Sequence, residues 1–335
     1  MIREFRDISL FERNSFHVDV MARRLLEFDS VEDLRAIFSE PIGDWMVLSG
    51  GNNVLFTKPF EGTILTPVAD EIKPLSQRGD DIYIKVSAGR EWDELVAWAA
   101  EHDLWGIENL SYIPGKVGAA PIQNIGAYGV EVKDVITSVE LYTPASGRVS
   151  VMSAEECGFG YRDSVFKREL RGKVIVTAIE LKLSRLAKPN LVYGDLIKEV
   201  EARGGATLKN IREAVIAIRQ SKLPEPSELG NGGSFFKNPA VDAKLAEVLK
   251  SQYPAMPIYP IADSDMVKLA AGWLIDRAGM KGYRDGRVGV HERQALVLVN
   301  HGGAMGEEIL ALSRQVQDRV NRCFGVHIEA EVNII

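Results

Sequence analysis

One stretch of this 335-residue chain decides how the rest is interpreted: residues 113–129, IPGKVGAAPIQNIGAYG. It holds four glycines, two prolines and three alanines, which is too many breakers for a helix and too few bulky side chains for a core. Because glycine allows another group to approach the backbone closely, the stretch predicts a bed for a flat cofactor. The alternative is an irregular connector packed against its own domain.

Two further glycine clusters lie between segments with regular patterns. Gly50-Gly51-Asn52-Asn53 follows an apolar strand candidate, where successive backbone N–H groups can enclose a phosphate; the alternative is an ordinary tight turn. Glycines 230, 232 and 233 precede Ser234 and two phenylalanines. We expect Ser234 on a glycine-rich turn anchored by these aromatics, as a proton donor requires, or as a simple turn or capping residue.

Composition excludes several classes of function. With 40 Lys and Arg against 47 Asp and Glu, the net charge of −7 is wrong for a polybasic binder of nucleic acid or membrane surfaces. Two distant cysteines predict a reducing compartment and no structural zinc, and Ala295 stands where a zinc-protease motif starting at His291 needs its second histidine. The first residues lack a signal-peptide pattern, so we expect a cytosolic protein without a membrane segment.

Periodicity predicts alternating helices and strands, with a boundary at Pro224 and Pro226. The expected helices cover 30–38, 91–102, 210–220, 241–251, 266–278 and 306–323, and the expected strands cover 45–48, 54–56, 63–65, 82–86, 174–183, 296–299 and 328–334.

Common catalytic signatures are missing from the chain: no G-x-G-x-x-G follows a strand, and neither Walker A nor Gly-x-Ser-x-Gly occurs. Arg162 stands beside Asp163, its simplest partner, and Glu331 alternates with apolar residues of the last strand and faces solvent in the simplest interpretation. From the residues alone, the chain is a multidomain nucleotide-binding protein whose reaction is undetermined.

Three motifs occurring in this order resemble the flavoprotein family of UDP-N-acetylenolpyruvoylglucosamine reductases, and the resemblance runs from Asn14 to Val332. The motifs are residues 113–129, the segment Gly160-Tyr161-Arg162-Asp163-Ser164-Val165-Phe166-Lys167 and the segment Gly233-Ser234-Phe235-Phe236-Lys237-Asn238-Pro239. The resemblance implies an α+β fold, in which a two-subdomain FAD-binding cradle of the vanillyl-alcohol-oxidase-like (PCMH) type is joined to a third α+β domain for the substrate. The implied boundaries are 1–72, 73–224 and 225–325, and a last strand at 326–335 carries Glu331 back to the active site.

The resemblance also implies the cofactors, FAD with NADPH as reductant. The first glycine loop would take the FAD pyrophosphate, and the stretch 113–129 would lie along the flavin. The family loop usually reads Gly-x-Gly-Ser-Asn, so Asn52 replaces a serine and its hydroxyl contact. The matching cofactor positions are Gly50, Gly51, Asn52, Asn53, Gly115, Gly118, Ala119, Ala120, Ile122, Gln123, Gly126 and Arg219.

The implied reaction is the reduction of the enolpyruvyl ether of UDP-N-acetylglucosamine in peptidoglycan synthesis. Ser234 matches the family's proton donor, and Arg162 and Glu331 match the residues that stabilise the developing negative charge. A bare carboxylate opposes an enolate, so we expect Glu331 to be protonated or to act through Arg162 and water.

Substrate-binding positions follow from the same resemblance. Tyr193 matches the tyrosine that marks one of the family's two types and folds over the nucleotide sugar. The other matching positions are Lys222, Asn238, Tyr259, Lys281 and Gln294. We expect a monomer without nucleic-acid, membrane or metal partners. Two alternatives stay open at this point: another flavin oxidase or dehydrogenase of the same cradle fold, and a non-catalytic flavoprotein that binds nucleotide sugars.

Overall fold

The computed structural model describes residues 1–261 and 264–335. Its contacts divide the chain into two compact units. The first unit comprises Met1–Ile8, Ala22–Gly50 and Phe60–Ser221, and the second comprises Ser9–Met21, Gly51–Pro59 and Lys222–Ile335. Both units mix helices with sheets.

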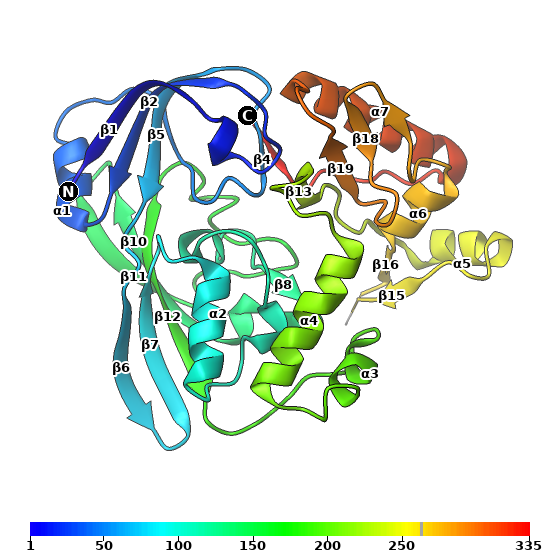
Figure 1. Cartoon of the computed structure of the whole chain (residues 1–335), viewed down its shortest axis with the longest axis horizontal. Helices are drawn as coiled ribbons and strands as arrows, with labels where there is room; N and C mark the ends of the chain where they lie inside the picture. The colour runs from blue at the N-terminus through cyan, green and yellow to red at the C-terminus, as the bar shows by residue number, and fades with distance from the viewer. Residues whose placement is uncertain (262–263) are drawn as a thin grey trace. The chain divides into compact units, whose positions relative to one another are not determined.

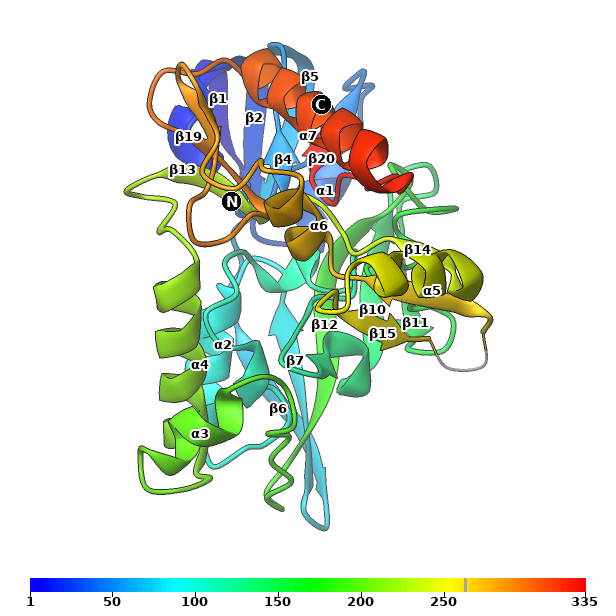
Figure 2. The same cartoon turned by 90° about the vertical axis from the view of Figure 1, so that its right-hand side faces the viewer.

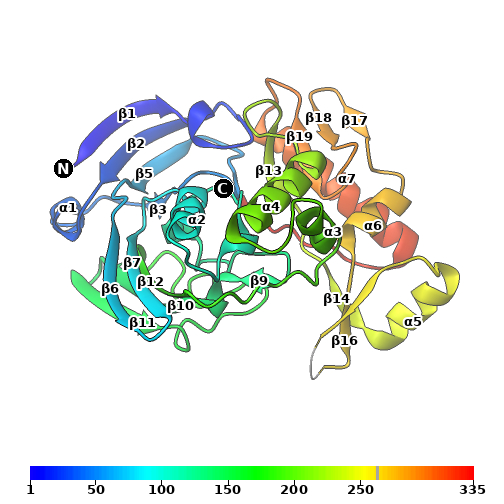
Figure 3. The ribbon, with the colours of Figure 1, turned by 60° about the horizontal axis from the view of Figure 1, so that its bottom comes forward.

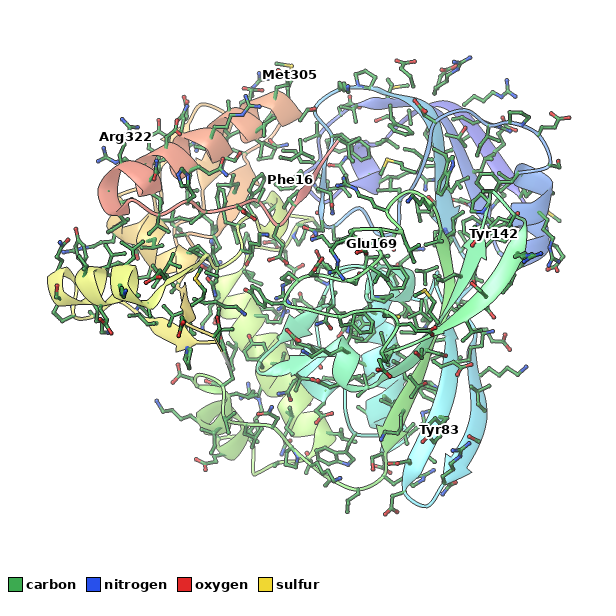
Figure 4. All side chains as sticks on the ribbon, turned by 180° about the vertical axis from the view of Figure 1, so that it is seen from behind. Phe16, Tyr83, Tyr142, Glu169, Met305 and Arg322 are labelled. Atoms are coloured by element: carbon green, nitrogen blue, oxygen red, sulfur yellow. The ribbon has the colours of Figure 1, made fainter. Side chains whose placement is uncertain are left out.

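Two sheets form the framework of the first unit. One has the order β1-β2-β5-β3, from β1 (Arg3–Ser9), β2 (Met21–Phe28), β5 (Phe60–Pro67) and β3 (Trp45–Val47). The other is antiparallel with the order β11-β10-β12-β7-β6, from β11 (Arg148–Ser153), β10 (Ile136–Thr143), β12 (Ile175–Ser184), β7 (Asp81–Ser87) and β6 (Ile72–Arg78). The buried ring of Tyr142 on β10, labelled in Figure 4, packs with Leu26 and Leu65 of the first sheet and so joins the two cores.

Helix α2 (Trp92–Glu101) covers one face of the larger sheet. Its buried residues are Trp92, Leu95, Val96 and Ala99, the positions expected from 3-and-4 spacing. They share a core with strand residues such as Ile84 of β7. Helix α1 (Val31–Ile37) begins as predicted, since the Ser30 side chain accepts a hydrogen bond from the Asp33 N–H.

Two further helices complete this unit. Helices α3 (Leu196–Glu201) and α4 (Leu208–Lys222) form a hairpin, which Figure 3 shows. The two helices share a small apolar cluster of their own. Helix α4 runs beside α2 (Figure 1), and Arg212 of α4 makes two hydrogen bonds to Asp93 of α2, at 2.5 and 2.7 Å. The stretch 113–129 contains the short 3-10 turn Val117–Ala119 and strand β8 (Gly126–Ala127), which pairs with β9 (Val130–Glu131). Most of it is irregular, as predicted.

The second unit contains a four-stranded sheet with the order β13-β19-β18-β17 and a three-stranded sheet with the order β14-β16-β15. Figure 2 shows α5 beside the smaller sheet. The strands are β13 (Gly230–Ser234), β14 (Ala240–Asp242), β15 (Ile258–Pro260), β16 (Met266–Leu269), β17 (Arg284–Asp285), β18 (Val288–Val290) and β19 (Val297–Asn300), and the helices are α5 (Ala243–Gln252), α6 (Ala271–Arg277) and α7 (Gly306–Phe324).

The chain's last residues pair with an early segment of the same unit. Strand β20 (Asn333–Ile334) runs parallel to β4 (Val54–Leu55), the strand that follows the first glycine loop. The Ile335 N–H donates to the Leu55 carbonyl at 2.9 Å, and the Ile335 carbonyl accepts from Thr57. Segments about 280 residues apart in sequence therefore form one parallel pair.

Three sequence predictions about local structure were wrong. Met266–Leu269 is a strand, so the helix expected from 266 starts only at Ala271. The strand expected over 328–334 shrinks to Asn333–Ile334, which leaves Glu331 just outside it. Ser234 ends strand β13 instead of standing on a turn. Short apolar runs fit helix and strand alike, and pairing partners decide between them.

Candidate functional site

Strand β3 leads directly into the first glycine loop, and two buried hydroxyls lie near this end of the sheet. Strands β3 and β5 run parallel, and Val47 of β3 pairs with Leu65 of β5. Ser49 comes two residues after Val47, and Thr66 comes directly after Leu65. The Oγ of Ser49 and the Oγ1 of Thr66 are both buried, and neither has a hydrogen-bond partner in the part of the chain that the structure describes. Buried hydroxyls normally find a partner, so this strand edge fits a bound group with oxygen acceptors, such as a pyrophosphate.

Gly51 needs to be glycine because the chain passes close to it. Its φ is +66°, and a Cβ built there would lie 2.1 Å from the carbonyl oxygen of Arg13. The Gly51 carbonyl accepts a hydrogen bond from the Ser15 N–H at 3.2 Å. The carbonyl of Asn53 accepts from both the backbone and the side chain of Asn333 at 3.0 Å. The second half of this loop is thus held by segments of its own unit, while Gly50 belongs to the first unit with Ser49.

In the stretch 113–129, part of the glycine requirement comes from protein neighbours. A Cβ on Gly118 would lie 2.6 Å from the Cβ of Ala88, and one on Gly126 would lie 3.2 Å from a terminal nitrogen of Arg162. Gly115 has φ +114°, and its carbonyl accepts a hydrogen bond from the Trp92 N–H, the first residue of α2. Packing within the same unit, the alternative left open by the sequence, therefore accounts for part of these glycines. Ala119, Ala120, Ile122 and Gln123 lie in the turns between Gly118 and Gly126.

Arg162 lies at the tip of a tight turn in which Gly160 and Asp163 exchange backbone hydrogen bonds. Its own φ of +53° is in the left-handed region, which costs a residue with a Cβ about 1–2 kcal/mol. The guanidinium donates to the Gly126 carbonyl at 2.9 Å, and Asp163 pairs with Arg168 instead. The simplest expectation, an Arg162–Asp163 pair, was wrong: Arg162 is directed to the glycine-rich stretch.

Arg219 is a half-buried cation on α4. Its Nε donates to the Tyr112 carbonyl at 3.0 Å, and Tyr112 is itself left-handed with φ +59°. The Tyr112 N–H donates to Asp93 at 2.5 Å, and the same carboxylate receives Arg212. Burial lowers the pKa of the Arg219 guanidinium, while the electrostatic attraction of Tyr128 and Asp93 opposes this shift. Asp93, Arg212 and Tyr112 thus fix a predicted cofactor residue, and no motif or spacing in the sequence points to them.

Tyr193 precedes α3 and is half exposed, at 52% of its surface. Its ring meets that of Tyr128 edge to face, with centroids 6.0 Å apart. Beneath it, the Asn109 side chain donates to the carbonyls of Tyr128 and Asn190, at 2.9 and 2.7 Å. A tyrosine with half of its surface exposed can contact a ligand through its ring and its hydroxyl.

In the second unit, Ser234 is held by strand pairing and by its aromatic neighbours. It pairs with Val297 of β19 and is followed by the fully buried Phe235 and Phe236. Phe16, labelled in Figure 4, lies edge to face with Phe235 at 6.1 Å. A Cβ on Gly232 would lie 2.6 Å from the Phe16 ring, so these glycines also make room for protein atoms.

Glu331 lies close to Ser234 through the backbone. Its N–H donates to the Phe235 carbonyl at 2.7 Å, and its own carbonyl accepts from the Asn53 side chain at 3.3 Å. The next residue, Phe236, forms an isolated antiparallel β-bridge with Ala330. Two of the three predicted catalytic residues, nearly 100 positions apart in sequence, therefore stand on neighbouring chain segments.

The predicted substrate residues of the second unit are spread over several elements. Asn238 accepts a hydrogen bond from the Ala271 N–H at the start of α6, at 2.9 Å. The N–H of Gln294 donates to Nδ1 of the buried His291, at 3.3 Å. Lys281 pairs with Asp276 at 3.1 Å, Tyr259 is exposed on β15, and Lys222 is exposed at the end of α4.

Residues 1–261 and 264–335 contain neither a candidate membrane span nor a candidate metal cluster. No helix there is long and apolar enough to cross a membrane. No three His, Cys, Asp or Glu side chains there gather in a way that suits a metal ion.

Comparison with known proteins defines the class first. A family model described as an FAD binding domain matches residues 24–153, and a model described as the C-terminal domain of UDP-N-acetylenolpyruvoylglucosamine reductase matches residues 225–335. The fold class is therefore that of an α+β FAD-binding oxidoreductase, which confirms the expected fold and cofactor.

Whole-chain relatives define the family. A protein from Chromobacterium violaceum named UDP-N-acetylenolpyruvoylglucosamine reductase is 47% identical to this chain, and the match covers 100% of both chains. A protein of the same name from Bacteroides fragilis is 45% identical, and the match covers 98% of both chains. A crystal structure of the reductase from Thermus caldophilus superposes with a TM-score of 0.71 at 25% identity, over 100% of this chain and 99% of that one. The chain belongs to the UDP-N-acetylenolpyruvoylglucosamine reductase family, and the predicted family, enzyme class and cofactors are confirmed.

Proposed function

We propose that this chain performs the family's reaction through Ser234, Arg162 and Glu331, with the substrate and cofactor contacts expected from its sequence. The overall reaction reduces UDP-N-acetylglucosamine enolpyruvate to UDP-N-acetylmuramate for peptidoglycan synthesis, with NADPH as the electron source. The observation that carries the assignment of residues is the hydrogen bond from the Glu331 N–H to the Phe235 carbonyl, because it fixes Glu331 beside the residue that follows Ser234.

When bound, FAD would supply the redox chemistry that carries a hydride from NADPH to C3 of the enolpyruvyl group. The two orphaned hydroxyls of Ser49 and Thr66 support pyrophosphate binding next to the loop Gly50–Asn53. Asn52 in place of serine removes one hydroxyl from that loop, and the Ser49 hydroxyl, three positions earlier, offers a donor in the same segment. Arg219 adds a half-buried positive charge next to the stretch 113–129, through its bond to the Tyr112 carbonyl.

Ser234 donates the proton that C2 of the substrate requires. A serine hydroxyl is a weak acid, but a carbanion beside a carboxylate is a strong base, so a weak acid held in position is sufficient. The β13–β19 pairing and the buried Phe235 restrict the Ser234 backbone. Such restriction is what a positioned donor needs.

Arg162 stabilises the negative charge that develops on the substrate. Its guanidinium is directed by the bond to the Gly126 carbonyl, and an arginine carries five N–H donors in a fixed planar geometry. An arginine can bind a carboxylate through two parallel hydrogen bonds, which suits the enolpyruvyl group. Glu331 acts in protonated form or through Arg162 and water, because a bare anion would oppose the charge.

The nucleotide sugar is held by Tyr193, Lys222, Asn238, Tyr259, Lys281 and Gln294. Lysines suit the diphosphate as point charges, and a tyrosine can stack on uracil. The exposure of Tyr193, Tyr259 and Lys222 supports roles in ligand contact. This assignment makes the chain a member of the family type with a tyrosine lid.

Three further expectations remain proposals. The chain is a monomer, it is located in the bacterial cytoplasm, and its domains cover residues 1–72, 73–224 and 225–325, followed by a final segment 326–335. The match of the C-terminal family model to 225–335 supports the boundary near Pro224. Sedimentation at several concentrations tests the monomer.

The decisive experiment is to purify the protein, release its flavin by denaturation and follow NADPH oxidation with and without the enolpyruvyl nucleotide sugar. We expect a yellow protein, free FAD after denaturation and oxidation that depends on this substrate. A colourless protein, or oxidation that is indifferent to the substrate, contradicts the proposal.

A further inference from the structure

Asn124 is a fully buried side chain in the stretch 113–129. Its φ of +47° lies in the left-handed region, which asparagine tolerates better than most residues. Its amide nitrogen donates to Oε2 of Glu131 and to the Gly160 carbonyl, both at 2.9 Å. Its amide oxygen accepts from the Lys133 N–H at 3.1 Å. Both amide hydrogens and the oxygen are thus engaged in one network.

The bond from Asn124 to Gly160 matters because Gly160 starts the turn whose tip is Arg162. A second buried tie runs parallel to it: the Ser164 hydroxyl, at the other end of the turn, donates to the Ile122 carbonyl at 2.5 Å. Asn124 and Ser164 are both fully buried. The turn is therefore fastened at both ends to residues 122 and 124 of the glycine-rich stretch.

Between these ties, the Arg162 side chain returns to the same stretch and donates to the Gly126 carbonyl. A long arginine on a left-handed turn has many orientations, and fixing the base of the turn reduces them. Small displacements of a positioning contact are enough to cost about 10²-fold in rate.

We propose that Asn124 is a positioning residue. By holding the Gly160 carbonyl, it fixes Arg162 against the stretch 113–129. The inference rests on the proposed role of Arg162 in stabilising charge on the substrate. Asn124 is suited to this task because Glu131 is already balanced by Lys133, whose Nζ lies 2.8 Å from the same carboxylate oxygen. Asn124 is therefore a neutral donor that links the Glu131 carboxylate, already paired with Lys133, to the Gly160 carbonyl.

The main test is Asn124→Gly, which tolerates the positive φ and removes the whole side chain with its amide. We expect the half-reaction in which the enolpyruvyl substrate reoxidises the reduced enzyme to slow by about 10- to 100-fold. Reduction by NADPH and the dissociation constant of FAD should change by less than about twofold, because neither requires Arg162. Asn210→Ala is the matched control, since Asn210 also donates to two carbonyls, those of Arg203 and Gly205, elsewhere in the same unit.

A double-mutant cycle with Arg162→Ala separates the possible results. If Asn124 acts through Arg162, adding Asn124→Gly to Arg162→Ala has little further effect on the substrate half-reaction. Equal slowing in both backgrounds overturns the proposal, as does equal loss of both half-reactions or of FAD affinity in Asn124→Gly alone. If Arg162→Ala itself leaves the substrate half-reaction unchanged, the proposed function of Arg162 has failed instead.

Ser164→Ala provides a second variant should Asn124→Gly not fold. It removes the hydroxyl tie to Ile122 and leaves Asn124 in place. We expect the same selective slowing of the substrate half-reaction, of about 10-fold, with NADPH reduction preserved. An unchanged substrate half-reaction in Ser164→Ala would show that anchoring this turn is unimportant for Arg162.

Discussion

At the scale of single residues, Ser234 owes its position to neighbours that have no chemistry of their own. Phe235 and Phe236 are buried directly behind it, Phe16 packs on Phe235, and Val297 pairs with it on β19. The hydroxyl is thus presented by a packed strand end, which restrains it more than a mobile turn would.

For Ser234→Ala we expect NADPH still to bleach the flavin while turnover with substrate falls by about 10²- to 10⁴-fold, the scale for losing a positioned acid. Stopped-flow absorbance of the two half-reactions measures this split. Ser251→Ala, which removes an exposed hydroxyl bonded to the Val248 carbonyl in α5, is the control. Failure of the flavin-reduction step in Ser234→Ala would mean that its assigned role is wrong.

Tyr193 is a second residue whose role can be isolated. Tyr193→Phe removes only the hydroxyl and keeps the edge-to-face contact with Tyr128. We expect substrate affinity to fall by about 3- to 10-fold, the value of one hydrogen bond, with little change in the NADPH half-reaction. Titration of the oxidised enzyme with substrate, followed by flavin fluorescence, gives the affinity. Tyr283→Phe serves as a control at another exposed tyrosine, and unchanged binding in Tyr193→Phe would count against a lid.

At the scale of elements, the first glycine loop combines two demands on one residue. Gly51 has a positive φ and lies against the Arg13 backbone. Gly325, at the end of α7, has the same φ of +66°, but no atom of residues 1–261 or 264–335 outside its own neighbours lies within 4 Å of a Cβ built there. Replacing Gly325 by alanine therefore introduces backbone strain alone, and replacing Gly51 adds a clash with main-chain atoms.

We predict that Gly325→Ala lowers the free energy of unfolding by about 1–2 kcal/mol, the cost of a Cβ in the left-handed region. Gly51→Ala should lose a further 1–3 kcal/mol or so through overpacking. Urea unfolding followed by circular dichroism compares the two. Equal midpoints for both variants would show that the loop gives way to the added methyl group.

The elements also show how far sequence reasoning extends. Strong periodicity predicted α2 together with its buried face, and the capping serine predicted the start of α1. The same reasoning missed β1 and β6, which are mostly exposed. It also missed β2, β10 and β11, and it mistook β13 for a turn because of its glycines. Glycine content alone does not tell whether a ligand or another part of the chain approaches. At Gly232 the neighbour is Phe16, which lies more than 200 positions away.

The candidate site was likewise predicted only in part. The residues that resemble the family's motifs were found from the sequence, but those that hold them were not. Asn124, Asp93 and Arg212 act through distances and partners that no spacing reveals. Their detection needs coordinates, because an asparagine in a glycine-rich stretch has the same letter whether it faces solvent or bridges two segments.

At the scale of the whole molecule, pH should alter stability through buried histidine. Burial lowers the pKa of the His291 imidazole, and the charge of Arg293 acts in the same direction. The unfolded chain therefore binds a proton more readily than the folded one, so the stabilising contribution is present above about pH 6.5 and is lost as pH falls below it.

We expect the free energy of unfolding to decrease between about pH 7 and pH 5, and His291→Gln to show a shallower decrease. Urea titrations at several pH values measure the slope. His327→Gln, at an exposed histidine of the same unit, should keep the slope of the parent protein. A slope unaffected by His291→Gln would contradict this account.

The pairing of β20 with β4 has a consequence for synthesis of the chain on the ribosome. Residues 9–21 and 51–59 belong to the second unit, and β4 gains its parallel partner only when Asn333 and Ile334 have been made. At about 5–20 residues per second, the early segments wait roughly ten to sixty seconds for that partner. During this interval an apolar strand beside the first glycine loop is unpaired, so translation speed and early protection by chaperones should influence the yield of active enzyme.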